Sequence, residues 1–196
     1  MNAMFEVRLH GRGGQGVVTA AELLSVAAFL DGHCAQAFPS FGSERMGAPV
    51  VAFCRISESE IRTREPIVEP DALVVQDATL LHQVDVFSGL RTDGFLLINS
   101  GRTLHELGLE KLAIRFRPER IACVRATELA LTQIGRPVPN TVLVAALAAL
   151  TGVVSLDSVV EAVKQRFSGK VADGNVQAAI QGYELVRGAS AVVADA

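Results

Sequence analysis

The residues best suited to chemistry in this sequence form a glycine-rich segment near its beginning. Residues 10–16 read His-Gly-Arg-Gly-Gly-Gln-Gly, and the glycines at 11, 13 and 16 fit the pattern G-x-G-x-x-G. An apolar stretch at 4–9 predicts a strand before the segment, and an apolar stretch at 15–30 predicts a helix after it. Glycine lets a ligand approach the backbone closely, and the first turn of a helix presents unpaired N–H groups to anions. The segment therefore predicts a site for a phosphate-bearing or nucleotide-like ligand, although a tight strand-to-helix turn alone would explain the same glycines.

A nicotinamide site would require one more residue. Dinucleotide-binding folds place Asp or Glu about 20 residues after the glycines, at the end of the second strand. Residues 33–38 predict that strand, which ends in Gln36 and Phe38 and carries no acid. Asp31 precedes the strand, and Glu44 lies beyond it in a loop. The sequence therefore disfavours a free-standing dinucleotide-binding dehydrogenase domain, which is kept as an alternative.

The loop at 39–49 is predicted to lie at the same edge of the sheet as the glycine segment. It follows the second predicted strand directly, and ligands of open α/β sheets bind at the carboxyl ends of the strands. Its adjacent acid and base, Glu44 and Arg45, suit a charge-assisted contact with a phosphate, a carboxylate or another chain. Phe41 and Met46 are expected to be buried. We therefore predict that this loop covers the cleft beside the glycine segment.

Short apolar stretches that predict strands alternate with stretches that predict helices. The strands predicted after residue 38 are 50–56, 72–76, 95–98, 112–116 and 121–124. The helices predicted after residue 30 are 80–86, 127–134, 141–150, 156–167 and 172–186. Residues 141–150 are apolar on nearly every face, so that helix is expected to be buried in the chain or in a partner. This order predicts an α/β fold, Rossmann-like, with a mainly parallel sheet flanked by helices and a helical C-terminal part. Because no linker divides the sequence, we expect a single domain over residues 1–196.

Composition and charge exclude several classes of protein. The net charge of −3 argues against nucleic acid as a partner, and no apolar run approaches the roughly 20 residues of a membrane span. The first residues lack a basic region followed by a cleavable apolar segment, so secretion is not expected. Three isolated cysteines, Cys34, Cys54 and Cys123, indicate a reducing compartment and do not suffice for an iron–sulfur cluster. We therefore expect a cytoplasmic protein with no membrane or nucleic-acid partner.

Two long stretches of the sequence resemble the gamma subunit of pyruvate:ferredoxin oxidoreductases. Residues 11–24 read Gly-Arg-Gly-Gly-Gln-Gly-Val-Val-Thr-Ala-Ala-Glu-Leu-Leu. Residues 37–56 read Ala-Phe-Pro-Ser-Phe-Gly-Ser-Glu-Arg-Met-Gly-Ala-Pro-Val-Val-Ala-Phe-Cys-Arg-Ile. Shorter stretches at 135–141 and 169–175 are also similar, and the resemblance covers roughly residues 4–186. The two long motifs together are far more specific than G-x-G-x-x-G alone.

The resemblance implies a multisubunit enzyme that oxidatively decarboxylates a 2-oxoacid. In such enzymes the 2-oxoacid adds to thiamine diphosphate and loses CO2, two electrons pass through iron–sulfur clusters to ferredoxin or a similar acceptor, and coenzyme A takes the acyl group. It also implies that alpha, beta and delta-type partner subunits hold the thiamine diphosphate and the clusters. This chain would contribute to assembly and to a shared coenzyme A site. Met46 stands where a second basic residue would follow Arg45, so pyruvate, another aliphatic 2-oxoacid and an aromatic one such as phenylglyoxylate all stay open.

The resemblance and the glycine pattern together define a set of cofactor-binding candidates. These are Gly11, Arg12, Gly13, Gly14, Gln15, Gly16, Glu44, Arg45 and Asn140. Backbone N–H groups of the glycine segment would hold a coenzyme A phosphate or a neighbouring chain's carboxylate, and Arg12 would add a charge-assisted contact. Asn140 would serve as a helix N-cap or as a ligand contact, and His10 is expected to pack at the end of its strand. No residue is a convincing nucleophile or general base, and a purely structural assembly subunit is a further alternative.

Overall fold

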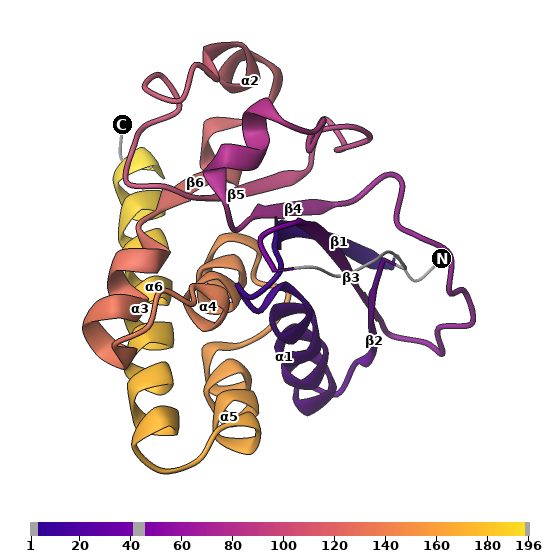
Figure 1. The fold of residues 1–196 in the computed structure, drawn as a ribbon. Coiled ribbons are helices and arrows are strands. Elements are labelled where there is room, and N and C mark those ends of the chain that lie inside the picture. The colour runs from indigo at the N-terminus through magenta and orange to yellow at the C-terminus, as the bar shows by residue number, and fades with distance from the viewer. Residues whose placement is uncertain (1–3, 41–45, 195–196) are drawn as a thin grey trace.

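The computed structural model describes residues 4–40 and 46–194, which form one mixed sheet with helices on both faces (Figure 1). The strands are β1 Phe5–Arg12, β2 Cys34–Pro39, β3 Pro49–Ser57, β4 Ala72–Val75, β5 Phe95–Asn99 and β6 Ile121–Val124. The helices are α1 Val17–Leu30, α2 Glu110–Arg115, α3 Ala126–Ile134, α4 Asn140–Thr151, α5 Leu156–Arg166 and α6 Gly169–Ala194. Short 3₁₀-helices occupy Ala78–His82 and Pro118–Arg120. The predicted α/β fold with a helical C-terminal part is confirmed.

The strand order is β2-β3-β1-β4-β5-β6. β1, β4, β5 and β6 pair in parallel, whereas β3 pairs antiparallel with both β1 and β2. Since β1 and β2 both oppose β3, they run in the same direction. The carboxyl ends of β1, β2 and β4 therefore meet at one edge of the sheet.

Alternation along β1 divides its side chains between two layers. Val7 and Leu9 are buried on the face covered by α1 and α4, while Arg8 and His10 point to the opposite face. The larger core lies on the first face, and a smaller core around Leu73, which faces the second layer, fills the space under the 78–116 region. The sheet is thus buried on both faces, which is typical of parallel sheets.

Helix α4 lies at the centre of the helical layer, between α1 and α6 (Figure 1). Its side chains from Asn140 to Ala148 are all buried. The prediction that a helix apolar on nearly every face is buried is therefore confirmed, and the neighbouring helices of the same chain cover it.

The predicted strand at 112–116 is wrong, because these residues belong to the end of α2 and the turn after it. A strand would place Leu112, Ile114 and Phe116 on one face. Instead Phe116 is buried and Leu112 partly buried in the smaller core, whereas Ile114 is 87% exposed. The spacing of four between the two packed residues is helical, and a short apolar run does not distinguish the two periods. The helix predicted at 80–86 is also different in the structure. It is a shorter 3₁₀-helix, and it spans Ala78–His82.

Candidate functional site

The glycine segment lies at the carboxyl edge of the sheet, between the ends of β1 and β4. From β1 the chain turns through α1 to β2 and β3 on one side, and it then returns to form β4 on the other side. Such a reversal of strand order opens a crevice between the two neighbouring strands, where ligands of open α/β sheets bind. The topology therefore places the glycine segment at the crevice of this sheet.

Strand β1 continues further into the glycine segment than predicted. Gly11 and Arg12 pair with Val50 and Pro49 of β3, so the pattern begins inside the sheet and only its second half forms the turn. A Cβ on Gly11 would lie 2.5 Å from Cγ2 of Val17 at the start of α1. The first glycine is thus required by the close contact between strand and helix.

Gly14 and Gly16 adopt left-handed backbone conformations that side chains disfavour. Their φ values are 92° and 73°. A Cβ on Gly14 would lie 2.8 Å from Cε of Met46, and a Cβ on Gly16 would lie 2.6 Å from Nδ2 of Asn140. Both glycines are therefore required by the protein itself, through backbone conformation and through packing.

Several backbone N–H groups of the segment have no acceptor in the part of the chain that the structure describes. The N–H groups that bond within the protein are those of Arg12, Gly13 and Gln15. The N–H groups with no acceptor among residues 4–40 and 46–194 include those of Gly14, Gly16 and Val17. A hollow of about 210 Å³ opens beside them, lined by Arg12, Gly14, Gly16, Val17, Val18, Thr19 and Val50. Free donors at a helix N-terminus beside a hollow are suited to hold an anion.

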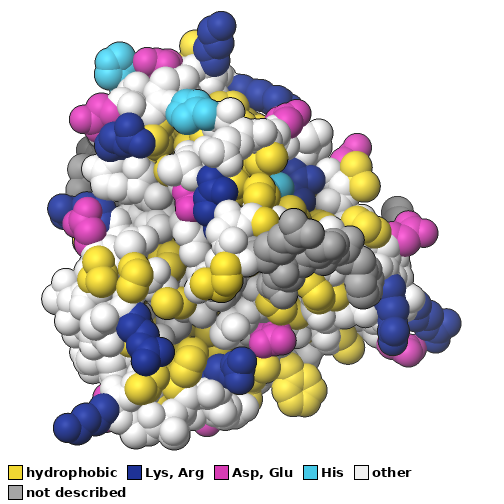
Figure 2. Space-filling model, in the orientation of Figure 1, with side chains coloured by type: hydrophobic (Ala, Val, Ile, Leu, Met, Phe, Trp, Pro, Cys, Tyr) yellow, Lys and Arg dark blue, Asp and Glu magenta, His cyan; other side chains and the backbone are white. Residues whose placement is uncertain are grey.

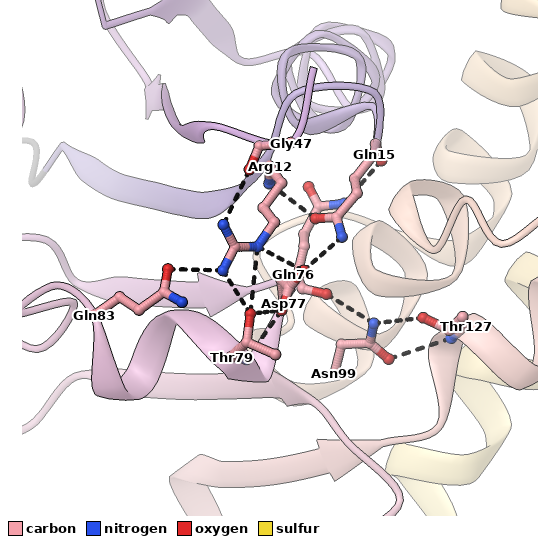
Figure 3. A network of polar contacts seen from close by, with 9 residues as sticks. All are labelled: Arg12, Gln15, Gly47, Gln76, Asp77, Thr79, Gln83, Asn99 and Thr127. Atoms are coloured by element: carbon pink, nitrogen blue, oxygen red, sulfur yellow. Dashed lines mark hydrogen bonds and ion pairs between the residues drawn. The ribbon is translucent and has the colours of Figure 1, made fainter. Parts of the chain in front are cut away.

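The Arg12 guanidinium binds protein groups with each of its nitrogens (Figure 3). Nε lies 3.2 Å from Oδ2 of Asp77, and Nη1 donates to the carbonyl of Gly47 at 3.0 Å. Nη2 donates to Oγ1 of Thr79 at 2.7 Å and to Oε1 of Gln83 at 2.8 Å. Arg12 therefore joins the glycine segment to Gly47 before β3 and to the 3₁₀-helix after β4, and its phosphate contact stays a prediction.

Asp77 lies at the centre of the same network. Oδ2 accepts from Nε2 of Gln15 at 2.7 Å, and Oδ1 accepts from the backbone N–H and the hydroxyl of Thr79 at 2.9 and 2.6 Å. Burial by itself raises the pKa of Asp77, but the hydrogen bonds from Thr79 and Gln15 and the charge of Arg12 outweigh it and hold the pKa below its usual value. Asp77 is thus an ionised carboxylate at neutral pH.

Sequence analysis missed three polar residues that extend this network. Nε2 of Gln76, which is 1% exposed, lies 3.3 Å from the carbonyl of Gln15. Asn99 at the end of β5 donates to the carbonyl of Gln76 and to Oγ1 of Thr127, at 2.8 and 2.7 Å (Figure 3). Their position at the ends of predicted strands is the signal that would have identified Gln76 and Asn99. Together they fix the ends of β4 and β5 relative to the glycine segment.

The structure brings Asn140 to the glycine segment, but not as a helix N-cap. Helix α4 begins at Asn140 itself, and Pro139 occupies the position before it, so the predicted N-cap is wrong. Oδ1 of Asn140 accepts the backbone N–H of Thr141 at 2.8 Å, and Nδ2 lies beside Gly16. Proline presets the backbone for a helix start, which explains the earlier boundary.

Phe41, Glu44 and Arg45 lie outside the described residues, whereas the end of their loop contacts the glycine segment. Gly47 donates its N–H to the carbonyl of Gly13 at 3.0 Å, and Met46 forms a bridge with Gly13. The expectation that Met46 is buried is wrong, because it is 86% exposed although its Sδ and Cε lie over Gly14. The loop thus ends directly against the crevice.

His10 packs at the carboxyl end of β1 and is 8% exposed, as expected. Burial and then the nearby charge of Arg8 lower the pKa of His10 to about 4. His10 is therefore neutral at physiological pH, and it serves the packing of the second layer.

No group of three or more His, Cys, Asp or Glu side chains among the described residues is arranged to hold a metal ion. None of the helices within 4–40 and 46–194 combines the length and apolar character needed to cross a membrane.

Comparison with known proteins identifies the family of the chain. Residues 6–185 match the family described as pyruvate ferredoxin/flavodoxin oxidoreductase. The chain is 49% identical over 181 residues to the pyruvate/ketoisovalerate oxidoreductases common subunit gamma of Pyrococcus furiosus, covering 92% of this chain and 96% of that protein.

Two solved structures share the fold. A pyruvate oxidoreductase subunit PORC from Thermotoga maritima superposes with a TM-score of 0.77 at 38% identity, covering 92% of this chain and 96% of that one. A 2-oxoglutarate:ferredoxin oxidoreductase from Magnetococcus marinus, with 2-oxoglutarate, coenzyme A and succinyl-CoA bound, has a TM-score of 0.71 at 16% identity, and matches 95% of this chain and 31% of that one. The second likeness shows the fold alone. With a family match that spans most of the sequence, the chain belongs to the pyruvate ferredoxin/flavodoxin oxidoreductase family, as one of its gamma-type subunits.

Proposed function

We propose that this chain forms part of the coenzyme A-binding cleft in a multisubunit enzyme that oxidatively decarboxylates pyruvate or a similar small 2-oxoacid. The observation that carries the proposal is the group of backbone N–H donors at the start of α1 that have no acceptor within residues 4–40 and 46–194 and lie beside the hollow at Gly14 and Gly16. Coenzyme A brings phosphate oxygens that accept such hydrogen bonds. Gly11, Gly13 and Gln15 shape the turn, Asn140 lies at its side, and Glu44 and Arg45 would complete the cleft from the loop.

The remaining cofactors belong to partner subunits in this proposal. Alpha, beta and delta-type subunits hold thiamine diphosphate and the iron–sulfur clusters, and ferredoxin or a similar acceptor takes the electrons. The chain has three cysteines, all free, which fits a reducing cytoplasm and offers no cluster ligation. The chain acts as one gamma-type domain over residues 1–196.

Exposed apolar side chains support the assembly role. Phe29 at the end of α1 is 71% exposed and Ile114 on α2 is 87% exposed, and Val171 on α6 is also in solvent. Figure 2 shows hydrophobic side chains reaching the surface between charged groups on the face it presents. Partner subunits would cover such groups, since burial of each large apolar side chain stabilises an assembly.

The test uses the assembled complex, purified without oxygen, with Gly14→Val in this chain. Valine at φ 92° is strained and would collide with Met46, so the turn must change shape. We expect the KM for coenzyme A to rise by about tenfold, with the KM for the 2-oxoacid within about twofold of its starting value. The substrate panel includes pyruvate, branched aliphatic 2-oxoacids and phenylglyoxylate.

Gly152→Val is the matched control. Gly152 follows α4 with φ 67° and has open space around it, so valine brings backbone strain at a distance from the crevice. An intact Gly14→Val complex with unchanged dependence on coenzyme A would refute the ligand role. The purely structural assembly subunit would then be the correct interpretation.

A further inference from the structure

Asp77 links the turn of the glycine segment to the end of β4 through both of its carboxylate oxygens. Oδ1 accepts two hydrogen bonds from Thr79 and thereby starts the 3₁₀-helix after β4. Oδ2 accepts from Nε2 of Gln15 at 2.7 Å and lies 3.2 Å from Nε of Arg12. One carboxylate thus holds two segments that lie more than sixty residues apart in the sequence.

Gln15 transmits this contact to the backbone of the turn. Its Oε1 accepts the N–H of Arg12 at 2.8 Å, and its own N–H donates to the carbonyl of Arg12 at 3.0 Å. Arg12 and Gln15 are therefore joined twice, and Gly14, with its positive φ, lies between them. Since Gln15 presents its acceptor to Arg12 and its donor to Asp77, these two contacts together fix the orientation of the amide.

Asp77 pairs with Arg12, which lines the hollow, and an uncompensated carboxylate beside the hollow would repel an anion. Here the guanidinium of Arg12 is the compensating charge, and the pair leaves no net charge at this point of the crevice. The donors left for a ligand are the backbone N–H groups at the start of α1. Their direction depends on the shape of the turn.

We propose that Asp77 is a positioning residue for coenzyme A binding, because it fixes the turn through Gln15 so that the N–H groups of α1 face the ligand. This inference rests on the proposed function. It predicts that loss of the Asp77 carboxylate weakens binding of coenzyme A without touching the reacting atoms.

The experiment compares three forms of the assembled complex with the unaltered one: Asp77→Asn, Gln15→Met and the double variant. Asparagine keeps the shape of Asp77 and can still accept from Thr79, but its amide would face Gln15 and Arg12 with a donor. We expect about a tenfold rise in the KM for coenzyme A and a kcat within about twofold, and faster hydrogen exchange at residues 12–18. Because both residues act through one contact, the double variant should be no worse than the weaker-binding single variant.

Asp31→Asn is the matched control. Asp31 follows the other end of α1, where its carboxylate accepts from the N–H and hydroxyl of Ser155 at 2.6 and 2.8 Å and from the hydroxyl of Ser158 at 2.6 Å. Asp31 accepts three hydrogen bonds from neutral groups, as Asp77 does. It lies away from the carboxyl edge of the sheet. Its loss should lower the Tm and leave the KM for coenzyme A unchanged.

The outcomes separate this inference from the proposed function. If Gly14→Val raises the KM for coenzyme A while Asp77→Asn does not, the proposed site stands and the role of Asp77 is refuted. If neither variant changes the KM, the proposed site itself is refuted. If Asp77→Asn lowers only the Tm, as Asp31→Asn does, Asp77 is merely structural. If its effect on the KM adds fully to that of Gln15→Met, Asp77 does not act through Gln15, and the inference is refuted.

Discussion

The side-chain amide of Asn140 occupies the space that a side chain at Gly16 would require. Nδ2 lies 2.6 Å and Cγ lies 3.2 Å from the position of a Cβ on Gly16. Gly16 directly precedes α1 and Asn140 is the first residue of α4, so the two helices begin in contact. A glycine is thus required at position 16 by its packing against a residue more than one hundred positions later in the sequence.

Gly16→Ala is expected to lower the free energy of unfolding by about 1–3 kcal/mol, because it combines backbone strain at φ 73° with a collision against Asn140. Urea unfolding of the purified chain measures the change. Gly108→Ala is the control, since Gly108 has φ 70° but open space around it. The double variant Gly16→Ala with Asn140→Ala should recover part of the loss. An equal loss of unfolding free energy in Gly16→Ala and Gly108→Ala would show that backbone strain alone destabilises the variants.

The sequence predicted the parts of the fold that depend on local pattern. The strand before the glycines, the long apolar helix α1 and the all-apolar helix α4 are each encoded in contiguous residues, and each appears in the structure. The strand predicted around Ile114 was wrong because the apolar run there is short. Such a run does not distinguish the period of a strand from that of a helix.

The contacts that hold the site could not be predicted in this way. Arg12 and Asp77 meet only because β1 and β4 are neighbours, and that pairing depends on the strand order of the whole sheet. From sequence, Arg12 is a free cation beside glycines, which suggests a phosphate contact. The structure gives it a carboxylate, a carbonyl and two side-chain acceptors, and these contacts become visible only in the tertiary structure.

Arg8 is a buried arginine that binds backbone carbonyls. Nη1 donates to the carbonyls of Ile67 and Val68 at 3.4 and 3.3 Å, and Nη2 donates to those of Val86 at 3.1 Å and Ser88. One guanidinium thus donates hydrogen bonds to backbone carbonyls of two loops that cover the second face of the sheet.

We expect Arg8→Met to lower the free energy of unfolding by about 3 kcal/mol, because the buried carbonyls lose their donors. Lysine should recover only part of this, since it lacks the planar set of donors. Thermal unfolding of the purified chain measures both changes. Arg62→Met, at a side chain that is 85% exposed, should have little effect, and a similar loss at both positions would contradict the role of Arg8.

Cys54 should be unreactive in the folded protein. It is 0% exposed on β3, and burial raises the pKa of its thiol well above the usual value, which removes the reactive thiolate. Alkylation followed by mass spectrometry should modify Cys54 at the rate of unfolding, and at once in denaturant. The exposed Cys34 of the isolated chain is the internal reference. Equal labelling of the two thiols under native conditions would contradict the burial of Cys54.

His10 should make the stability of the chain depend on pH in the acid range. Its pKa is about 4 in the folded state and 6.5 in the unfolded chain, so the unfolded chain binds more protons between these values. The stabilisation is therefore complete above about pH 6.5 and is lost as the pH falls from there to about 4. Between pH 7 and pH 5 the expected loss from this residue is about 2 kcal/mol. Urea unfolding of His10→Gln should show a pH dependence that is weaker by this amount. An unchanged slope in His10→Gln would mean that His10 is hydrated or protonated in the folded protein.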